Sequence, residues 1–400
     1  MPGTPEFVNE ELNRLAEAGL ARRLITVTTR QGRTVEVAGR RVLSFCSNDY
    51  LGLAGDRRLA EAAAAALERY GLGSAASRLV SGNMTLHETL EARLADFKGT
   101  EAALLFTTGH AANLGTIPAL VGRGDLVVGD RLNHASIIDG CRLSGATLRV
   151  YPHRDVDRLE RILKRGSQYR RRLVVTDTVF SMDGDVAPLG GIVALAGRHD
   201  AMVMVDEAHA TGVLGKNGRG AAEALGASDR IQVQMGTLSK ALGALGGYVA
   251  GTARLIEFLR QRARSFVYST APPVAVCAAA LAALEIVQAE PDRRRRCLDL
   301  TRRLRDRFSE RWSGPLLPAG EPLTPIIPVV VGDKQRACHA AEALFERGFL
   351  VRAIRPPTVP AGTSRLRISV TAAHTREDVD ALAAALDDVL PLSLPGRGPG

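Results

Sequence analysis

The sequence has few cysteines, few aromatic residues and no long apolar run. Its five cysteines are scattered without a Cys-x-x-Cys pair, which argues against a structural zinc site or a disulfide framework and fits a reducing compartment. No apolar run reaches the roughly 18 residues that span a bilayer. The longest, residues 271–284, contains Pro272 and stops at Glu285, so it predicts a buried helix. Residues 1–11 are acidic and lack a signal pattern, so we expect a cytoplasmic protein with no bound metal and no membrane segment.

Positive charge exceeds negative charge, with a net charge of +9 carried mostly by arginine. Arginine runs at residues 170–172 and 293–296 suggest a nucleic-acid surface, but no aromatic side chains interleave with them. Such runs are more often the solvated face of a helix. We therefore expect no nucleic-acid partner, although an anionic small-molecule carrier or an acidic carrier protein would be attracted equally well.

Helical patterns alternate with short apolar runs along the first two thirds of the chain. Asp56 begins a helix that Gly71 ends, and Thr85 with Glu88 predicts a capping box for the next helix. The apolar runs are continuous, which indicates strands covered on both faces. They lie at residues 102–106, 126–128, 173–175, 202–205, 231–235 and 247–250. The sequence therefore predicts an α/β fold with a mostly parallel sheet.

The pattern changes around Pro272. An arginine-rich helical region at about 274–312 leads to a proline-rich connection at 314–328. A strand at 326–331, a helix at 334–347, strands at 349–353 and 365–370, and a final helix capped by Thr375 and Asp378 follow. We predict an N-terminal arm (1–45), a large domain (46–272), a small C-terminal α/β domain (273–391) and a flexible tail (392–400).

Polar side chains follow one predicted strand after another. Because the carboxyl ends of parallel strands meet at one edge of a sheet, these side chains predict a ligand site. A lysine such as Lys240, among apolar and small residues, can lose its proton, act as an amine nucleophile and anchor pyridoxal phosphate. Asp206 is then placed to keep a pyridine nitrogen protonated, and His209 can reach the phenolic oxygen of the ring.

Three further features fit the same ligand. His134 offers a flat face for stacking on the ring. Gly109 and His110 begin a helix whose free N–H groups suit a phosphate, and Thr237 can add a hydroxyl donor. Each residue also has an ordinary structural explanation: a histidine or aspartate at a strand end is often only a satisfied polar or turn residue, and a lysine is usually solvated. The order and spacing of the whole set favour a site.

Two other patterns are misleading. Residues 206–209 spell the DEAH box of helicases, but the chain contains no G-x-x-x-x-G-K-[ST] phosphate loop. Residues 71–76 resemble a dinucleotide fingerprint, yet they follow a helix rather than a strand. We interpret them as a loop in which the backbone can approach a ligand closely.

The motifs SNDYLG (47–52), DEAHATG (206–212) and TLSKALG (237–243) together resemble the α-oxoamine synthases. These are fold-type I pyridoxal-phosphate enzymes, related to aspartate aminotransferase, that join an amino acid to an acyl thioester and lose CO2. The resemblance covers about residues 20–390. Residues 268–273 (YSTAPP) and 354–360 (IRPPTVP) are similar to the branch that uses L-alanine and a pimeloyl thioester in biotin synthesis. His110 departs from the family, which usually has Phe or Tyr at that position.

The resemblance implies a role for each matching residue. Lys240 holds the cofactor as a Schiff base, Asp206 pairs with the pyridine nitrogen and His134 stacks on the ring. The other implied cofactor contacts are His209 and Ser181 near the ring oxygen, Gly109, His110 and Thr237 at the phosphate, and Thr270 from the neighbouring subunit of a homodimer. The implied substrate contacts are Arg367 and Asn48 for the amino-acid carboxylate, and Arg22 and Thr358 for the acyl chain. Arg23 stands beside Arg22 and leaves that choice open.

The resemblance implies condensation of L-alanine with pimeloyl-CoA or pimeloyl-acyl carrier protein. A relative that uses glycine, such as 2-amino-3-ketobutyrate CoA ligase, or one that uses serine or another acyl chain, stays open as an alternative. A non-catalytic scaffold would not need the set of polar residues at the strand ends. A nucleic-acid ATPase would need the phosphate loop that is absent.

Overall fold

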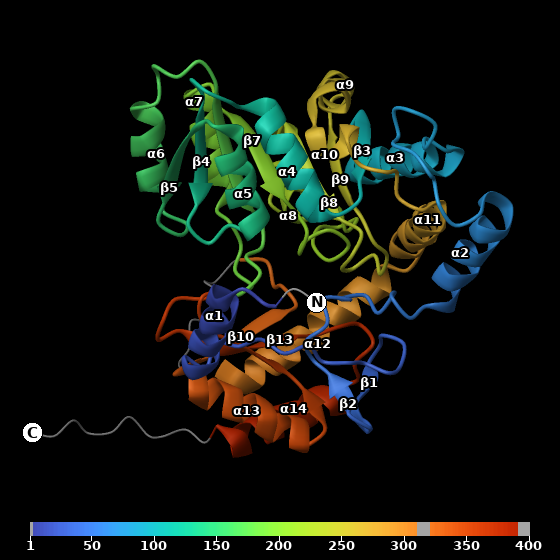
Figure 1. The fold of residues 1–400 in the computed structure, drawn as a ribbon, viewed down its shortest axis with the longest axis vertical. Coiled ribbons are helices and arrows are strands. Elements are labelled where there is room, and N and C mark those ends of the chain that lie inside the picture. Colours follow the sequence, from blue (N-terminus) through green and yellow to red (C-terminus); the bar gives the residue numbers. More distant parts are fainter. Residues whose placement is uncertain (1–2, 310–320, 391–400) are drawn as a thin grey trace, which may run out of the picture.

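A seven-stranded sheet forms the centre of the upper part of the molecule in Figure 1. The computed structural model describes residues 3–309 and 321–390. In spatial order the strands are β3 (Ala102–Phe106), β9 (Gly247–Gly251), β8 (Val233–Thr237), β7 (Met202–Asp206), β6 (Arg172–Asp177), β4 (Leu126–Asp130) and β5 (Thr147–Tyr151). Every neighbouring pair is parallel except those of β9, which runs antiparallel to both β3 and β8. The predicted mostly parallel α/β sheet is confirmed.

Helices cover both faces of this sheet, which is why its strands, apart from the exposed edge strand β5, are mostly apolar. One face packs against α4 (Gly109–Leu120), α5 (Ala135–Ser144), α9 (Ala253–Arg262) and α10 (Arg264–Val267). The other packs against α3 (Thr85–Lys98), α6 (Val156–Lys164), α7 (Leu189–Arg198) and α11 (Val274–Ala289). The remaining helices of this part are α2 (Arg57–Tyr70), α8 (Ala221–Ala224) and the 3-10 helix η1 (Ser228–Arg230). Neighbouring residues alternate between the two cores: Leu104 lies in one and Leu105 in the other.

A third apolar core lies in the lower part of Figure 1. It is formed by the antiparallel sheet β10 (Ile326–Gly332), β13 (Ser364–Ser369) and β12 (Arg352–Ile354), with α12 (Pro291–Ser309), α13 (Lys334–Glu346) and α14 (Arg376–Val389). A third sheet joins β1 (Thr34–Val37) and β2 (Arg40–Ser44) to β11 (Phe349–Leu350). The boundaries that we predict at residues 45 and 272 stay predictions. The tail at 392–400 and the first half of the proline-rich connection lie outside the described residues.

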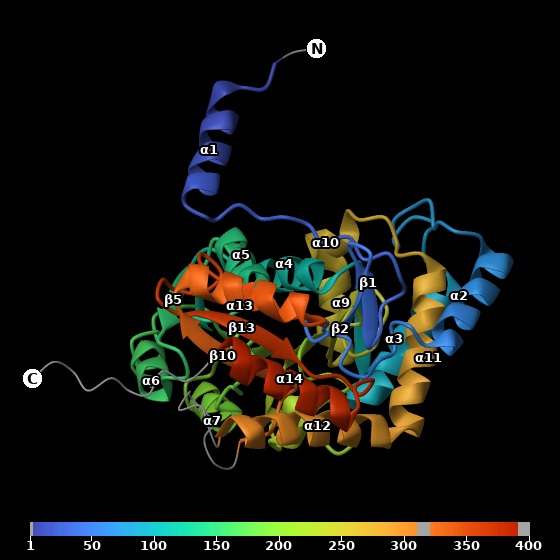
Figure 2. The ribbon, with the colours of Figure 1, turned by 90° about the horizontal axis from the view of Figure 1, so that it is seen from below.

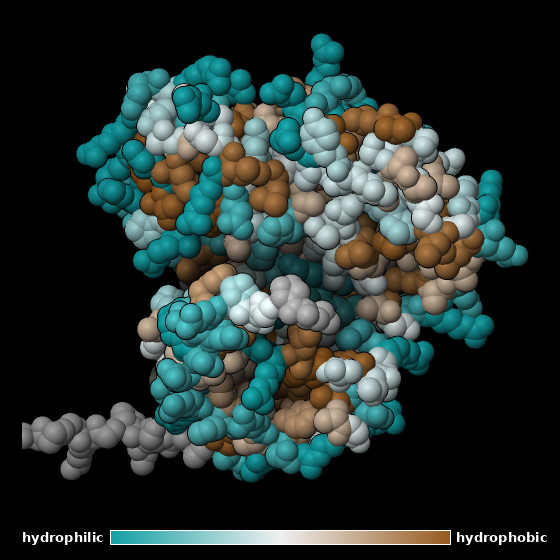
Figure 3. Space-filling view, in the orientation of Figure 1, coloured by the Kyte–Doolittle hydropathy of each residue, from teal (hydrophilic) through white to brown (hydrophobic). Residues whose placement is uncertain are grey.

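The surface is hollowed between the two parts, and hydrophilic residues lie in this hollow (Figure 3). Figure 2 shows α1 (Glu6–Glu17) projecting from the rest of the molecule, and none of its residues is buried. Within residues 3–309 and 321–390, no single helix is long and apolar enough to cross a membrane. Helix α11 and residues 291–308 together have the length and composition of a membrane span, but the pair is bent by 76° at its break.

The region predicted to be helical at about 274–312 is helical as far as it is described, and it forms two helices, because the chain turns at Glu290 and Pro291 begins α12, a position that proline favours. Two other local predictions were wrong in detail. The strand predicted at 349–353 is divided between β11 and β12, which pair with different sheets. Helix α3 is capped through Nδ1 of His87, which accepts a hydrogen bond from the Met84 N–H at 3.0 Å, and not by a Thr85 capping box.

Candidate active site

A cavity of about 180 Å3 lies at the carboxyl ends of the parallel strands. Strands β6, β7 and β8 end at its wall with Asp177, Asp206 and Thr237, and the segment after β4 adds His134. The full lining is Gly109, His110, His134, Ser136, Asp177, Asp206, Ala208, His209, Met235, Thr237 and Lys240. The predicted convergence of polar residues at this edge of the sheet therefore holds for seven of the predicted site residues.

Lys240 supplies an amine to the cavity three residues after the end of β8. Burial lowers the pKa of its ammonium group to about 8, although the negative charges of Asp206 and Asp177 oppose this shift. Its Nζ lies 2.9 Å from Nε2 of His209. Burial also lowers the pKa of His209 well below its usual value, and the charge of Lys240 lowers it further. The pair therefore combines a partly deprotonated amine with a neutral imidazole near neutral pH.

Asp206 lies at the end of β7 and is almost fully buried. Its Oδ1 accepts a hydrogen bond from the Ala208 N–H and its Oδ2 accepts one from Nδ2 of Asn113, both at 2.9 Å. Asn113 is completely buried on α4 and also donates to the hydroxyl of Ser136 at 2.9 Å. The sequence pattern did not single out Asn113 as a site residue. Its position one turn into the helix that begins with Gly109 was the only signal.

His134 follows β4 and is held from two sides. Its backbone N–H donates to Asp177 at 2.6 Å, and its Nδ1 lies 2.8 Å from the hydroxyl of Ser136. Burial lowers the pKa of His134, so its ring is neutral near pH 7. Burial and the nearby charge of Asp206 raise the pKa of Asp177 well above its usual range. Ser136 thus holds the ring of His134 and Asp177 holds its backbone in the wall of the cavity, and neither was a predicted site residue.

Arg367 on β13 reaches toward the cavity from the lower part of the molecule. Its Nε donates to the carbonyl of Ser181 at 2.5 Å, and one terminal nitrogen lies 3.1 Å from Oδ1 of Asn48. The other terminal nitrogen donates to the hydroxyl of Tyr50 at 3.4 Å. The same hydroxyl lies 2.6 Å from Nδ1 of His209, which lines the cavity. Tyr50 therefore connects the buried guanidinium group with the cavity, although the sequence pattern did not indicate this.

Comparison with known proteins places the chain in a family. Residues 40–386 match the family model of class I and II aminotransferases. The chain belongs to this family. Its relatives named 8-amino-7-oxononanoate synthase include one from Anaeromyxobacter dehalogenans, 55% identical over 397 residues (99% of this chain, 98% of the relative), and one from Symbiobacterium thermophilum, 50% identical over 385 residues (96% and 97%). The resemblance to α-oxoamine synthases is confirmed.

Solved structures agree with the assignment of the fold. A serine palmitoyltransferase from S. paucimobilis, which holds PLP and myriocin, has a TM-score of 0.90 and 32% identity, covering 96% of each chain. An 8-amino-7-oxononanoate synthase from Francisella tularensis has a TM-score of 0.73 and 29% identity, covering 87% of this chain and 98% of that one. The predicted fold-type I architecture and the predicted cofactor, pyridoxal phosphate, are confirmed.

The cavity fits this cofactor chemically. It offers a buried amine of lowered pKa for an aldehyde and a buried carboxylate for a pyridine nitrogen. The N-terminus of α4, whose cap is the Thr108 hydroxyl, opens onto it, and helix N-termini attract phosphate. A Cβ on Gly109 would lie 3.2 Å from Met235 and 3.4 Å from Thr237, so the backbone approaches strand β8 closely here. In the described part of the chain, no group of three His, Cys, Asp or Glu side chains could hold a metal ion.

Six predicted contacts are not among the residues that line this cavity. Ser181, Asn48 and Arg367 form the cluster described above, and the other three are exposed. Arg22 is exposed in the segment between α1 and β1, and Thr358 is exposed with its N–H donating to the Arg355 carbonyl. Thr270 is also exposed, in an isolated bridge with Ser77. Arg23 lines a separate cavity of about 320 Å3. The roles of these residues stay predictions.

Proposed function

We propose that the protein condenses L-alanine with a pimeloyl thioester to give 8-amino-7-oxononanoate, CO2 and a free thiol, as a step of biotin synthesis. The observation that carries the proposal is the 55% identity to a synthase of that name over 99% of the chain. The contacts around Lys240, Asp206 and Arg367 support it, because they supply an amine, a buried carboxylate and a cation for the substrate carboxylate.

When bound, the cofactor supplies an aldehyde that bonds amines and a ring that accepts electron density from the substrate carbon. Lys240 anchors this aldehyde through Nζ. With a pKa of about 8, Nζ is in part unprotonated near neutral pH. Once alanine has replaced Lys240 on the aldehyde, the free Nζ can therefore take a proton from Cα of alanine. The carboxylate of Asp206, held in place by two hydrogen bonds, would pair with the pyridine nitrogen.

Arg367 orients the amino acid in this proposal. Its guanidinium group, held by the Ser181 carbonyl and Asn48, pairs with the substrate carboxylate and so fixes which bond to Cα faces the ring. A carbon–carbon bond then forms between Cα and the thioester carbonyl carbon while the carbon–sulfur bond breaks and the thiol leaves. The original carboxylate departs as CO2, and a proton returns to Cα.

The remaining assignments belong to the same proposal. Gly109, His110 and Thr237 hold the phosphate, His134 stacks on the ring, and Ser181 and His209 contact the region of the ring oxygen. Arg22 and Thr358 contact the acyl chain, and Thr270 reaches the site of a neighbouring subunit in a homodimer. We place this homodimer in the cytoplasm. CoA and acyl carrier protein are the two candidate thiol carriers.

Product analysis tests the proposal. Purified protein is supplied with alanine, glycine or serine and with pimeloyl-, acetyl- and palmitoyl-CoA, and the products are identified by mass spectrometry. We expect 8-amino-7-oxononanoate from alanine with pimeloyl-CoA, and none from the matched Lys240→Ala variant. A dominant product from glycine and acetyl-CoA would replace this function with that of the glycine-using relative, and a dominant product from serine and palmitoyl-CoA would indicate a sphingolipid-type synthase.

A further inference from the structure

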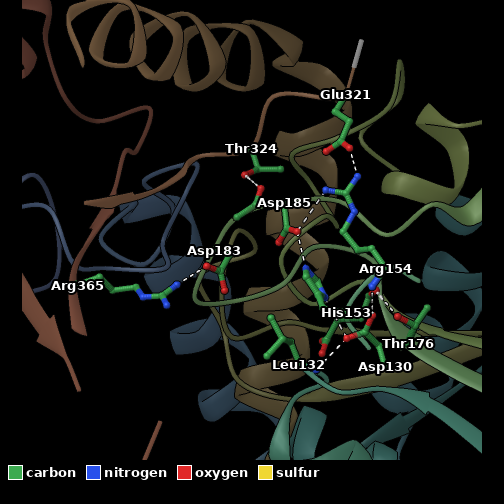
Figure 4. Close-up of polar contacts among 12 residues, drawn as sticks. Asp130, Leu132, His153, Arg154, Thr176, Asp183, Asp185, Glu321, Thr324 and Arg365 are labelled. Atoms are coloured by element: carbon green, nitrogen blue, oxygen red, sulfur yellow. Dashed lines mark hydrogen bonds and ion pairs between the residues drawn. The ribbon is translucent and has the colours of Figure 1, made fainter. Parts of the chain in front are cut away.

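A polar cluster outside the cavity is centred on His153, just after β5 (Figure 4). Its Nδ1 lies 3.0 Å from Oδ1 of Asp130 and its Nε2 lies 2.6 Å from Oδ2 of Asp185. Ionised carboxylates only accept hydrogen bonds, so both ring nitrogens must donate and the ring is an imidazolium. The edge of this ring also meets Phe180, with centroids 4.4 Å apart and planes at 88°. His153 is therefore tightly held on three sides.

The two carboxylates belong to different loops that both lead to the active site. Asp130 ends β4, and its side chain accepts the N–H groups of Leu132 and Arg154, each at 2.8 Å. This loop continues to His134 in the wall of the cavity. Asp185 belongs to the turn 180–186, which carries Ser181. His153 thus ties the loop before His134 to the turn that carries Ser181.

The turn 180–186 also makes several of the contacts between the two parts of the molecule. Its Ser181 carbonyl accepts from Nε of Arg367 at 2.5 Å, and its Asp183 side chain pairs with Arg365 on the same strand, β13. The Thr324 hydroxyl donates to the carbonyl of Gly184. A Cβ on Gly184 would lie 2.5 Å from the Ile326 carbonyl oxygen, so the turn fits closely against β10. A displacement of this turn would therefore displace the guanidinium group of Arg367.

The charges around His153 favour the protonated ring, which can donate to both carboxylates. The groups that face it are Asp130 from β4, Asp185 from the turn and Arg154 beside it, and Arg154 in turn contacts Asp185 and Glu321. Burial lowers the pKa of His153, but the hydrogen bonds to both carboxylates outweigh it and raise the pKa to about 9. The ring therefore remains charged near neutral pH.

We propose that His153 is a positioning residue for the amino-acid substrate: it clamps the turn 180–186, and the turn holds Arg367 through the carbonyl of Ser181. This inference rests on the proposed role of Arg367 in binding the substrate carboxylate. A purely structural histidine would affect the stability of the fold. A positioning histidine affects the Michaelis constant for the amino acid more than the turnover number, because Arg367 is displaced while Lys240 and Asp206 are not.

The test compares the His153→Gln and His339→Gln holoenzymes with the natural holoenzyme. Glutamine cannot donate from opposite ends to two carboxylates, whereas His339 is exposed on α13 and serves as the matched control. In His153→Gln we expect faster hydrogen–deuterium exchange in peptides covering 178–187, and a KM for the amino acid that rises about tenfold, as the loss of a charged hydrogen bond implies. We expect kcat to change by less than about threefold. His339→Gln should match the natural protein in all three measurements.

Unchanged exchange at 178–187, or an unchanged KM, overturns the proposal. A parallel loss of kcat and cofactor binding also overturns it, because it would mean that His153 only supports the fold. If His153→Gln does not fold, Asp185→Asn removes one charge of the clamp and must give the same pattern of exchange and KM. If the natural protein turns over no amino acid, the proposed function fails, yet the exchange measurement still decides whether His153 clamps the turn.

Discussion

The hydroxyl of Tyr50 lies 2.6 Å from Nδ1 of His209, and this contact joins the SNDYLG segment to the active-site cavity. On its other side the hydroxyl lies 3.4 Å from Arg367, while Nε2 of His209 lies 2.9 Å from Lys240. A continuous chain of contacts therefore runs from the proposed carboxylate-binding residue to the proposed cofactor lysine. Burial raises the pKa of Tyr50, so its hydroxyl keeps its proton and can donate to His209.

Replacing Tyr50 with phenylalanine should weaken this chain. The change leaves Nδ1 of His209 buried without its hydrogen-bond partner, which costs about 1–3 kcal/mol of free energy. We expect kcat/KM for the amino acid to fall by about 10- to 100-fold, since about 1.4 kcal/mol corresponds to a factor of ten. Steady-state kinetics measure this, with Tyr169→Phe as a control because Tyr169 lines a different pocket. A change of less than about twofold would show that the contact has no role in turnover.

The lowered pKa of Lys240 predicts how the rate of cofactor uptake depends on pH. Burial lowers this pKa to about 8, so the reactive unprotonated amine is present above that pH and is lost below it. The rate at which apoprotein takes up pyridoxal phosphate, followed by the yellow absorbance, should therefore rise with pH through a midpoint near 8. Borohydride should bleach the colour and add mass at Lys240, and Lys240→Ala should give neither signal. A midpoint at about 10, the usual range for lysine, would contradict the argument from burial.

The charge of Asp206 is predicted to contribute to turnover more than to assembly. In the proposed function Asp206 keeps the pyridine nitrogen protonated, so we expect Asp206→Ala to lower kcat by about 100-fold or more. The imine with Lys240 should still form, so the protein should remain yellow. Asp229→Ala, which removes an exposed carboxylate from η1, is the control. Unimpaired turnover by Asp206→Ala would refute the electrostatic role.

Much of the fold and of the cavity could be predicted from the sequence because both depend on local patterns. Continuous apolar runs predicted six of the seven strands of the central sheet, and several of the polar residues that follow them, including Asp206 and Lys240, line one cavity. The exposed edge strand β5 has no such run and was missed. The pairing of β2 with β11 joins segments about 300 residues apart, and no local pattern encodes it.

The missed residues share a physical cause. Asn113 and Tyr50 act through contacts between distant segments, and Ser136 acts through the neighbouring His134, so their identity alone does not separate them from ordinary polar residues. Asn113 lies 93 positions from its partner Asp206. By contrast, the family resemblance implied Arg22 and Thr358 as acyl-chain contacts, yet both are exposed in this chain and lie outside the cavity.

The hydrogen bonds of Asn113 are predicted to contribute to turnover. Asn113→Ala removes one of the two hydrogen bonds to Asp206 and also one to Ser136. We expect kcat to fall about tenfold, because a buried hydrogen bond to a charged group contributes about 1.5–3 kcal/mol. Thr116→Ala is the matched control: it lies on the same helix, is equally buried, and its hydroxyl has no partner within the described residues. Equal effects of the two changes would mean that Asn113 only fills space.

Next to Asp206, Glu207 forms an ion pair with Lys98, and both side chains are almost completely buried. Glu207 also accepts the Ala222 N–H at 2.8 Å, and Lys98 also donates to the Arg219 carbonyl. Lys98→Met leaves the carboxylate buried without its cation, which should lower the free energy of unfolding by about 3–5 kcal/mol. Chemical denaturation followed by circular dichroism measures this loss. The double variant Lys98→Met/Glu207→Gln removes both charges and should recover much of the stability, whereas Arg14→Ala, which breaks an exposed pair with Glu11, should leave the stability almost unchanged. If the double variant were less stable than Lys98→Met alone, the stranded charge could not be the cause of the loss.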